Sequence, residues 1–274
     1  MDKALVSICI PVYNGEKTIY DTVQAVLNQS YECMEILVID NCSTDKTREI
    51  IRSIDDPRLK LICNKENVGM VGNWNKCLEY STGDYAMIVC ADDIITEDCV
   101  KKKAKVLEKY KDVAVVFSAS SIIDDNSEVI ASRHPFHKNM IFDGKTFTRY
   151  SFRRHNIFGE PSNVMFKMSD ARKTGEFSDK LFYAPDWEYW MRLAKNGNVA
   201  YIDNELYKYR VSISNETSRI GFKKILEDDK TLISAMKKEY KLSFIDIGIH
   251  TISILIRSVL RWLFMNYRSL VRRK

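Results

Sequence analysis

The sequence predicts an α/β protein built around a central, mostly parallel β-sheet. Short apolar segments rich in β-formers alternate with amphipathic segments of helical period through residues 1–123, a rhythm typical of strands that alternate with helices. Of the 274 residues 45% are hydrophobic, and only 10 are Gly and 5 Pro. This composition excludes collagen-like, low-complexity and wholly disordered chains.

The first half of the chain carries the clearest elements. Buried strands are expected at 6–10, 36–39, 59–63, 85–90 and 113–123. Helices are expected at 18–29, 45–54, 72–80 and 96–110, the last with Thr96 as its N-cap.

The second half has a weaker pattern. From 124 to about 163 only turn signals are clear, so connecting loops and short strands are expected there. Later elements are expected as a strand at 164–166, a helix at 186–196, a strand pair at 199–202 and 206–211, and a solvated helix at 222–240.

The segment 242–267 predicts a long amphipathic helix, because polar residues recur in it at steps of mostly three or four. This polar stripe consists of Asp246, His250, Ser253, Arg257, Arg261 and Arg268. The longest uncharged stretch, 247–256, is about half of the roughly 20 residues that a membrane span needs. We therefore expect the helix to lie at a membrane surface, with Trp262 and Tyr267 near the headgroups. The alternative is packing on the protein's own core or on a second subunit, which leaves a homodimer open.

The charge distribution agrees with a membrane surface. Residues 241–274 carry seven basic side chains and one acidic, so this segment has a formal charge of +6 while the first 240 residues sum to −1. A basic tail on a nearly neutral body favours an anionic membrane over nucleic acid. The seven cysteines form no CxxC pair. Asp2 and Lys3, with an apolar run that stops at Pro11, do not fit a signal peptide. We therefore expect a cytoplasmic protein on the inner face of the cell membrane.

Acidic residues follow two of the predicted strands. Asp92 and Asp93 follow 85–90, and Asp40 ends 36–39. The carboxyl ends of strands in an open α/β sheet line the ligand crevice, and adjacent carboxylates repel unless a cation joins them, so the pair suits a divalent metal. Stabilisation by the dipole of the next helix explains the pair equally well. A third acid, Asp186, stands at a predicted helix start, where capping and chemistry are both open.

Five segments together resemble the family 2 glycosyltransferases of GT-A fold. They are VSICIPVYN at 6–14, ILVIDNCSTD at 36–45, NVG at 67–69, ADD at 91–93 and DWEYWMRL at 186–193. The resemblance covers roughly residues 4–215 and implies a transferase domain at 1–220, followed by a helical, basic, membrane-associating extension at 221–274. The implied reaction is inverting transfer of a hexosyl or N-acetylhexosaminyl group from a nucleoside-diphosphate sugar, with UDP favoured, to a glycan acceptor in polysaccharide synthesis.

The resemblance also implies roles for single residues. Asp186 would be the general base that removes the proton of the acceptor hydroxyl. Asp93 would ligate Mn²⁺ or Mg²⁺ on the donor diphosphate, and Asp92 would hold the ribose or the donor sugar. The rest of the nucleotide-sugar pocket would comprise Pro11, Val12, Tyr13, Asp40, Asn41 and Asn67. The acceptor side would include Glu160, Ser162 and Trp187.

Two positions depart from the family pattern. Asn41 stands where relatives usually have an acid that receives a pyrimidine N–H; its amide oxygen can still accept, so uracil or thymine stays feasible. Ser212 follows Tyr209-Arg210-Val211 where many relatives have a His, so Arg210 or solvent would take its place.

The basic tail favours a lipid-linked acceptor. Two other functions stay open. One is a non-catalytic nucleotide- or glycan-binding partner in a polysaccharide-synthesis complex, which would have no need of a base. The other is a nucleotidyltransferase, which would give no reason for an acid at Asp186.

Overall fold

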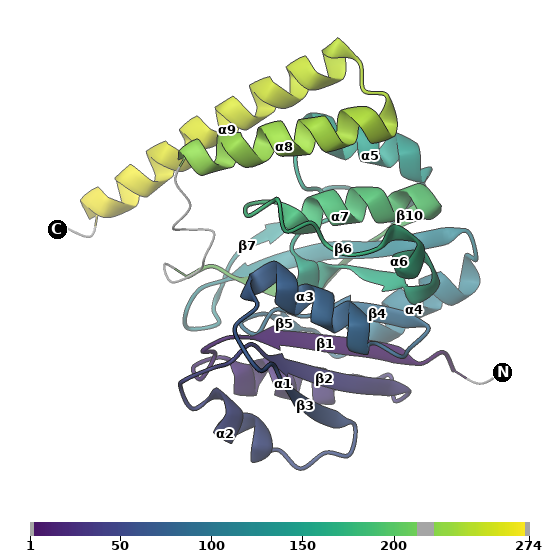
Figure 1. Ribbon diagram of the computed structural model, residues 1–274, viewed down its shortest axis with the longest axis vertical. Coiled ribbons are helices and arrows are strands. Elements are labelled where there is room, and N and C mark those ends of the chain that lie inside the picture. The colour runs from purple at the N-terminus through teal and green to yellow at the C-terminus, as the bar shows by residue number, and fades with distance from the viewer. Residues whose placement is uncertain (1–2, 213–221, 272–274) are drawn as a thin grey trace.

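The computed structural model describes residues 3–212 and 222–271 and contains one mixed β-sheet with helices on both faces (Figure 1). The predicted α/β class is confirmed. The strands lie in the order β3-β2-β1-β4-β9-β6-β10-β5, with β7 paired to β6 and β8 to β10. Their bounds are β1 Val6–Val12, β2 Met34–Asp40, β3 Leu59–Cys63, β4 Tyr85–Ile88, β5 Ile94–Ile95, β6 Val113–Ile123, β7 Val129–Arg133, β8 Met140–Phe142, β9 Met165–Lys167 and β10 Asn198–Arg210.

Parallel pairing holds together the half of the sheet made by β3, β2, β1 and β4, and it recurs between β6 and β10. The strand β9 runs antiparallel between β4 and β6 and joins the two parts. Because side chains alternate along a strand, Ile8 and Ile10 of β1 enter one core while Cys9 enters the other.

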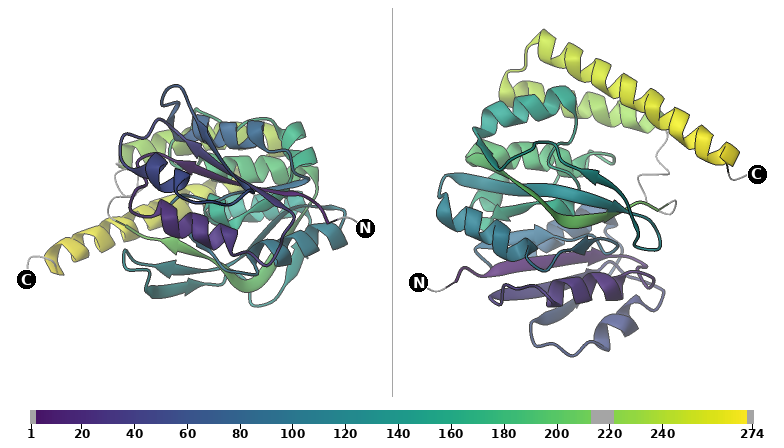
Figure 2. Two further views of the ribbon diagram at one scale, coloured as in Figure 1. Left: turned by 90° about the horizontal axis from the view of Figure 1, so that it is seen from below. Right: turned by 180° about the vertical axis from the view of Figure 1, so that it is seen from behind.

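The helices form layers on the two faces of the sheet. Apolar side chains of α1, α2 and α4 pack into one core, and those of α3, α5, α6 and α7 into the other. The helices α8 and α9 make an outer layer over α5 and α7 (Figures 1 and 2). The helix bounds are α1 Ile19–Leu27, α2 Thr47–Arg52, α3 Gly69–Tyr80, α4 Cys99–Lys109, α5 Gly144–Arg154, α6 Met168–Thr174, α7 Pro185–Leu193, α8 Phe222–Tyr240 and α9 Phe244–Val271.

Two expectations for the second half were wrong. The segment expected to contain only loops and short strands holds the helix α5, which Asp143 caps by accepting a hydrogen bond from the Thr146 N–H at 2.9 Å. The expected strand pair is one strand, β10, because register shifts between Ile202 and Tyr207 absorb the polar interruption.

The helix α8 is more than a solvated helix. Its Leu232 and Met236 are buried in the core. Its Asp228 accepts hydrogen bonds from the backbone N–H groups of Phe182 and Tyr183, the first at 2.6 Å. The helix therefore holds the loop that leads into α7.

The helix α9 turns the first residues of its polar stripe, Asp246, His250 and Ser253, inward toward α5 and α8. The Asp246 carboxylate pairs with Arg153 at 2.6 Å, and buried His250 lies 2.6 Å from the carbonyl oxygen of Phe152 and 2.5 Å from Asp229. Its apolar face points outward. The exposed side chains are Phe244, Ile245, Ile249, Ile252, Leu255, Ile256 and Val259.

The side chains of α9 are described as far as Val259. Those of Arg261, Trp262, Tyr267 and Arg268, expected at a membrane surface, lie outside the described residues. In the part of the chain that the structure describes, no helix combines the length and apolarity needed to cross a bilayer.

A close approach of backbone to α5 makes Gly144 a test of the fold. An added Cβ would lie 1.9 Å from the carbonyl oxygen of Ala194 and 2.1 Å from that of Gly197. We expect Gly144→Ala to lower the free energy of unfolding by about 2–3 kcal/mol in urea denaturation. Gly248→Ala is the control: it meets no heavy atom within 4 Å and should stabilise α9 by about 0.5–1 kcal/mol. Equal stability of Gly144→Ala and wild type would contradict this packing.

Candidate active site

The turn after β4 joins three distant segments through the Asp93 carboxyl group. This side chain is 1% exposed. Its Oδ2 accepts a hydrogen bond from the Ser162 hydroxyl at 2.5 Å, and its Oδ1 accepts one from the backbone N–H of Arg210 at 3.1 Å. The same Ser162 oxygen accepts from the N–H of Cys90 at 2.9 Å. The end of β4, the 3-10 helix Pro161–Asn163 and the end of β10 are thereby fixed together.

Asp92 is the more exposed member of the acidic pair. Burial raises the pKa of Asp92, and burial followed by the charge of Asp92 raises the pKa of Asp93 well above its usual range. A divalent cation would relieve this concentration of negative charge.

The two carboxyl groups of the pair differ in accessibility to a metal ion. Both oxygens of Asp93 accept hydrogen bonds inside the protein, whereas Asp92 is the more exposed of the two. Asp92 is therefore the more accessible ligand, while the ligand role expected for Asp93 stays a prediction. Among the described residues no group of three or more His, Cys, Asp or Glu could hold a metal ion. A cation here would therefore take most of its ligands from phosphate and water, as Mg²⁺ commonly does.

Arg210, the last residue of β10, holds the turn after β4 through hydrogen bonds. Its Nε donates to the carbonyl oxygen of Asp92 at 2.9 Å, one terminal nitrogen donates to the carbonyl oxygen of Asp124 at 2.8 Å, and the other donates to the hydroxyl of Ser127 at 3.0 Å. Its positive charge also lowers the pKa of Asp92, against the larger effect of burial. This residue, which sequence offered as a substitute for a histidine, thus ties a loop to the acidic pair.

Asp186 lies in the first turn of α7 and accepts a hydrogen bond from the Asn156 amide at 2.9 Å. Burial, assisted by the negative charge of Glu160, raises the pKa of Asp186 to about 7. The carbonyl oxygen of the Asn156 side chain is buried and has no partner among the described residues. A carboxyl group that titrates near neutral pH beside such a group has the properties of a general base.

Glu160 is a negative charge whose influence reaches both Asp93 and Asp186. Arg133 donates to its two oxygens at 2.5 and 3.2 Å, and the Tyr207 hydroxyl also contacts it. Although burial opposes ionisation, Arg133 lowers the pKa of Glu160. The charge of Glu160 in turn raises the pKa of both Asp93 and Asp186.

The expected nucleotide pocket is divided between exposed and buried residues. At the end of β1, Tyr13 is 52% exposed, Pro11 is half-buried and Val12 is buried. Asp40 is fully buried and pairs with the Arg48 Nε at 2.6 Å. The Asp40 carboxylate therefore faces the protein in this conformation and not an open pocket.

Asparagine side chains link the end of β2 to α3. The Asn41 amide donates to the side-chain oxygen of Asn67 at 2.9 Å, and its oxygen accepts from the amide of Asn64 at 3.0 Å. Asn64 also donates to Asn73, which donates to the carbonyl oxygen of Ile39, both at 2.9 Å. Asn41 is thus engaged at both side-chain atoms, while Asn67 is exposed at the rim.

Two expected acceptor contacts belong to the interior. Ser162 is fully buried and donates its hydrogen bond to Asp93. Trp187 is 4% exposed, donates to the Ser151 hydroxyl at 2.9 Å and packs into the core, as does Trp190. Neither tryptophan presents a face to a sugar, because Trp187 packs toward Ser151 of α5 and His250 of α9, and Trp190 packs on Phe166 of β9.

The sequence analysis did not identify three residues that lie at the site: Asn156, Arg133 and Tyr207. The first follows α5, the helix that was missed, and the other two lie on β7 and β10. Their roles come from contacts between distant segments, for which the sequence carries no local signal.

Comparison with known proteins gives consistent results. The family model described as "Glycosyl transferase family 2" matches residues 7–174. An uncharacterized glycosyltransferase of Methanocaldococcus jannaschii is 30% identical over 231 residues, which cover 82% of this chain and 77% of that protein. The Escherichia coli UDP-Glc:alpha-D-GlcNAc-diphosphoundecaprenol beta-1,3-glucosyltransferase WfgD is 27% identical, covering 91% and 95%. The putative teichuronic acid biosynthesis glycosyltransferase TuaG of Bacillus subtilis is 30% identical, covering 79% and 82%.

Solved structures confirm the expected GT-A fold. The S. aureus TarS 1–349 structure in complex with UDP-GlcNAc superposes with a TM-score of 0.73 at 18% identity, covering 91% of this chain and 71% of that one.

The bridge from Ser162 to Asp93 gives a test of this geometry. Ser162→Ala leaves Asp93 Oδ2 and the N–H of Cys90 without their partner, so the free energy of unfolding should fall by about 1–3 kcal/mol in urea denaturation. Ser53→Ala, at the exposed end of α2, is the matched control and should change it by no more than about 0.5 kcal/mol. Equal effects of the two substitutions would show that the hydrogen bonds of Ser162 add nothing to the stability of the fold.

Proposed function

The chain belongs to glycosyl transferase family 2, and from that premise we propose that it is an inverting, metal-dependent enzyme that transfers a sugar from a UDP-sugar to a glycan acceptor. The observation that carries the proposal is Asp186, whose pKa is raised to about 7 by burial. An acid near neutral pKa, on a different element from the acidic pair at the end of β4, suits a general base on the acceptor side.

The proposed reaction begins at the acceptor hydroxyl. Asp186 accepts its proton as the oxygen attacks the anomeric carbon from the face opposite the departing nucleoside diphosphate, so the configuration inverts. The hydrogen bond from Asn156 holds the Asp186 carboxylate in place. Preorganisation of this kind lowers the barrier because the base needs no reorientation.

The donor would lie at the carboxyl ends of β1, β2 and β4. Tyr13 offers an exposed ring and Asn67 an exposed amide at this edge; Pro11 and Val12 shape it, while Asp40 and Asn41 support it from within. Asp92 is the proposed ligand of Mn²⁺ or Mg²⁺, and Asp93 positions the turn that carries it. When bound, such an ion would neutralise charge on the departing diphosphate. The UDP and UDP-GlcNAc complexes of TarS and the UDP-Glc named for WfgD support UDP as the nucleotide.

The proposed acceptor is a lipid-linked glycan in polysaccharide synthesis, with a hexosyl or N-acetylhexosaminyl group transferred. WfgD is named for a diphosphoundecaprenol-linked acceptor, and TuaG for teichuronic acid biosynthesis. The outward apolar face of α9 gives independent support, because an exposed apolar helix face suits a membrane interface. We accordingly propose a transferase domain at 1–220 and an extension at 221–274 that rests on the inner face of the cell membrane.

Replacement of the proposed base gives the most specific test. Asp186→Asn removes proton acceptance while keeping size and hydrogen bonding, so transfer should fall by roughly 10²-fold or more. Binding of UDP, measured by calorimetry, should stay unchanged. Asp179→Asn in the exposed loop before α7 makes the same charge change and should leave transfer intact. Unchanged transfer in Asp186→Asn would remove this residue from the mechanism.

The pKa of Asp186 predicts a pH profile. Since the base must be ionised, kcat/KM for transfer should rise as the pH passes about 7 and level off above it. The hydrogen bond from Asn156 lowers this pKa, so Asn156→Ala should move the rising limb to higher pH. If the rising limb of the pH profile stayed in place or moved to lower pH, the result would argue against the hydrogen bond from Asn156 to Asp186.

A further inference from the structure

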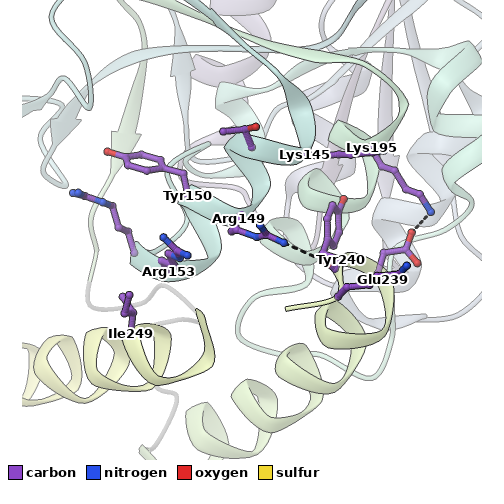
Figure 3. Close-up of a pocket in the computed structure, with 11 residues that line it drawn as sticks. Lys145, Arg149, Tyr150, Arg153, Lys195, Glu239, Tyr240 and Ile249 are labelled. Atoms are coloured by element: carbon purple, nitrogen blue, oxygen red, sulfur yellow. Dashed lines mark hydrogen bonds and ion pairs between the residues drawn. The ribbon is translucent and has the colours of Figure 1, made fainter. Parts of the chain in front are cut away.

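A basic cavity lies beside α9, away from the acidic centre. It has a volume of about 830 Å³ and is bounded by α5, the start of α9 and the turn between α8 and α9 (Figure 3). Its basic lining residues are Lys145, Arg149, Arg153, Arg154, Lys195 and Lys241. The only acidic lining residue among those described is Glu239.

The spacing of residues along α5 creates this surface. Lys145, Arg149 and Arg153 recur every four residues, so they lie along one side of the helix. Figure 3 shows Arg153 above α9 and Arg149 directed at Tyr240. The opposite side of α5 buries Phe147 and Phe152. A helix anchored by its aromatic face thus presents its cations to the cavity.

Counter-charges neutralise only part of this cluster. Glu239 pairs with Lys195, and Asp246 pairs with Arg153 at 2.6 Å and more distantly with Arg149 at 3.8 Å. Lys145, Arg154 and Lys241 form no ion pair with any described residue. Asp143, whose pKa is lowered by hydrogen bonds from Thr146 and by the charge of Lys145, is a third nearby carboxylate. Six cations against three carboxylates still leave an excess of positive charge that an anion would compensate.

The cavity adjoins the outward apolar face of α9. Ile249 lines the cavity and is itself 41% exposed. Ile245, Ile252, Ile256 and Val259 continue the same exposed row at steps of three and four. A surface that covered this row would therefore bring its own charged groups to the basic cavity.

We propose that the cavity binds the phosphate headgroup of an anionic membrane lipid while the apolar face of α9 enters the bilayer interface. Arginine and lysine side chains are suited to phosphate oxygens, and a soluble anion would give no reason for the adjoining apolar row. The inference rests on the proposed membrane location of the enzyme, but adds a specific lipid site formed largely by α5.

Vesicle co-sedimentation of the full chain tests the site. Wild type and Lys145→Glu/Lys241→Glu would be compared on phosphatidylcholine vesicles with and without phosphatidylglycerol. The control, Lys101→Glu/Lys105→Glu, makes the same charge change at exposed positions of α4. We expect the cavity variant to lose at least about tenfold in affinity for the anionic vesicles, the control to retain wild-type affinity, and all three proteins to bind neutral vesicles equally.

Three results would overturn the lipid site. The first is that the cavity variant binds anionic vesicles with wild-type affinity. The second is that the α4 control loses as much affinity as the cavity variant. The third is that the cavity variant alone loses calorimetric binding of inorganic phosphate while its vesicle binding is unchanged. The last result would assign the cavity to a soluble anion.

A separate readout distinguishes this failure from failure of the proposed enzyme. Calorimetric UDP binding should be the same in all three proteins, because the substitutions lie outside the nucleotide edge. Loss of lipid affinity with UDP binding retained supports the site, whereas absence of UDP binding in wild type contradicts the transferase proposal whatever the vesicles show.

Discussion

Burial of the Asp93 carboxyl group is the constraint on which the arrangement of the active site depends. A carboxyl group that is 1% exposed must find its hydrogen bonds inside the protein. It finds them on Ser162 and on the backbone of Arg210, which belong to segments far along the chain. The donor edge of the parallel strands is thereby fixed to the half of the molecule that carries Asp186.

The parallel half of the sheet could be predicted from the sequence because its information is local. Continuous apolar runs mark β1, β2 and β3, and the predicted bounds of β3 and β6 agree with the structure. The helix α5 was missed because its sequence is mostly basic and polar, and its few apolar residues, among them Phe147 and Phe152, become a buried face only when other segments cover them. The cap at Asp143 was its one local signal.

Sequence predicted the types of residue at the site better than the direction in which they point. Asp92 and Asp93 are adjacent, yet packing buries one and leaves the other partly exposed. Trp187 was expected to contact a sugar, but contacts with α5 and α9 take it into the core. The polar stripe of α9 was evident as a period of three and four, whereas the inward orientation of its first member, Asp246, depends on partners such as Arg153. Tertiary contacts decide each of these cases.

Nucleotide binding tests the central claim, that the donor edge holds a nucleoside diphosphate with a metal ion. The full chain would be titrated calorimetrically with UDP, dTDP, GDP and CMP, each in Mn²⁺ and in chelator. We expect binding of UDP or dTDP that requires the metal and that Asp92→Asn abolishes. Binding that is indifferent to chelator would contradict the metal site, and binding of none of the four nucleotides would contradict the donor pocket itself.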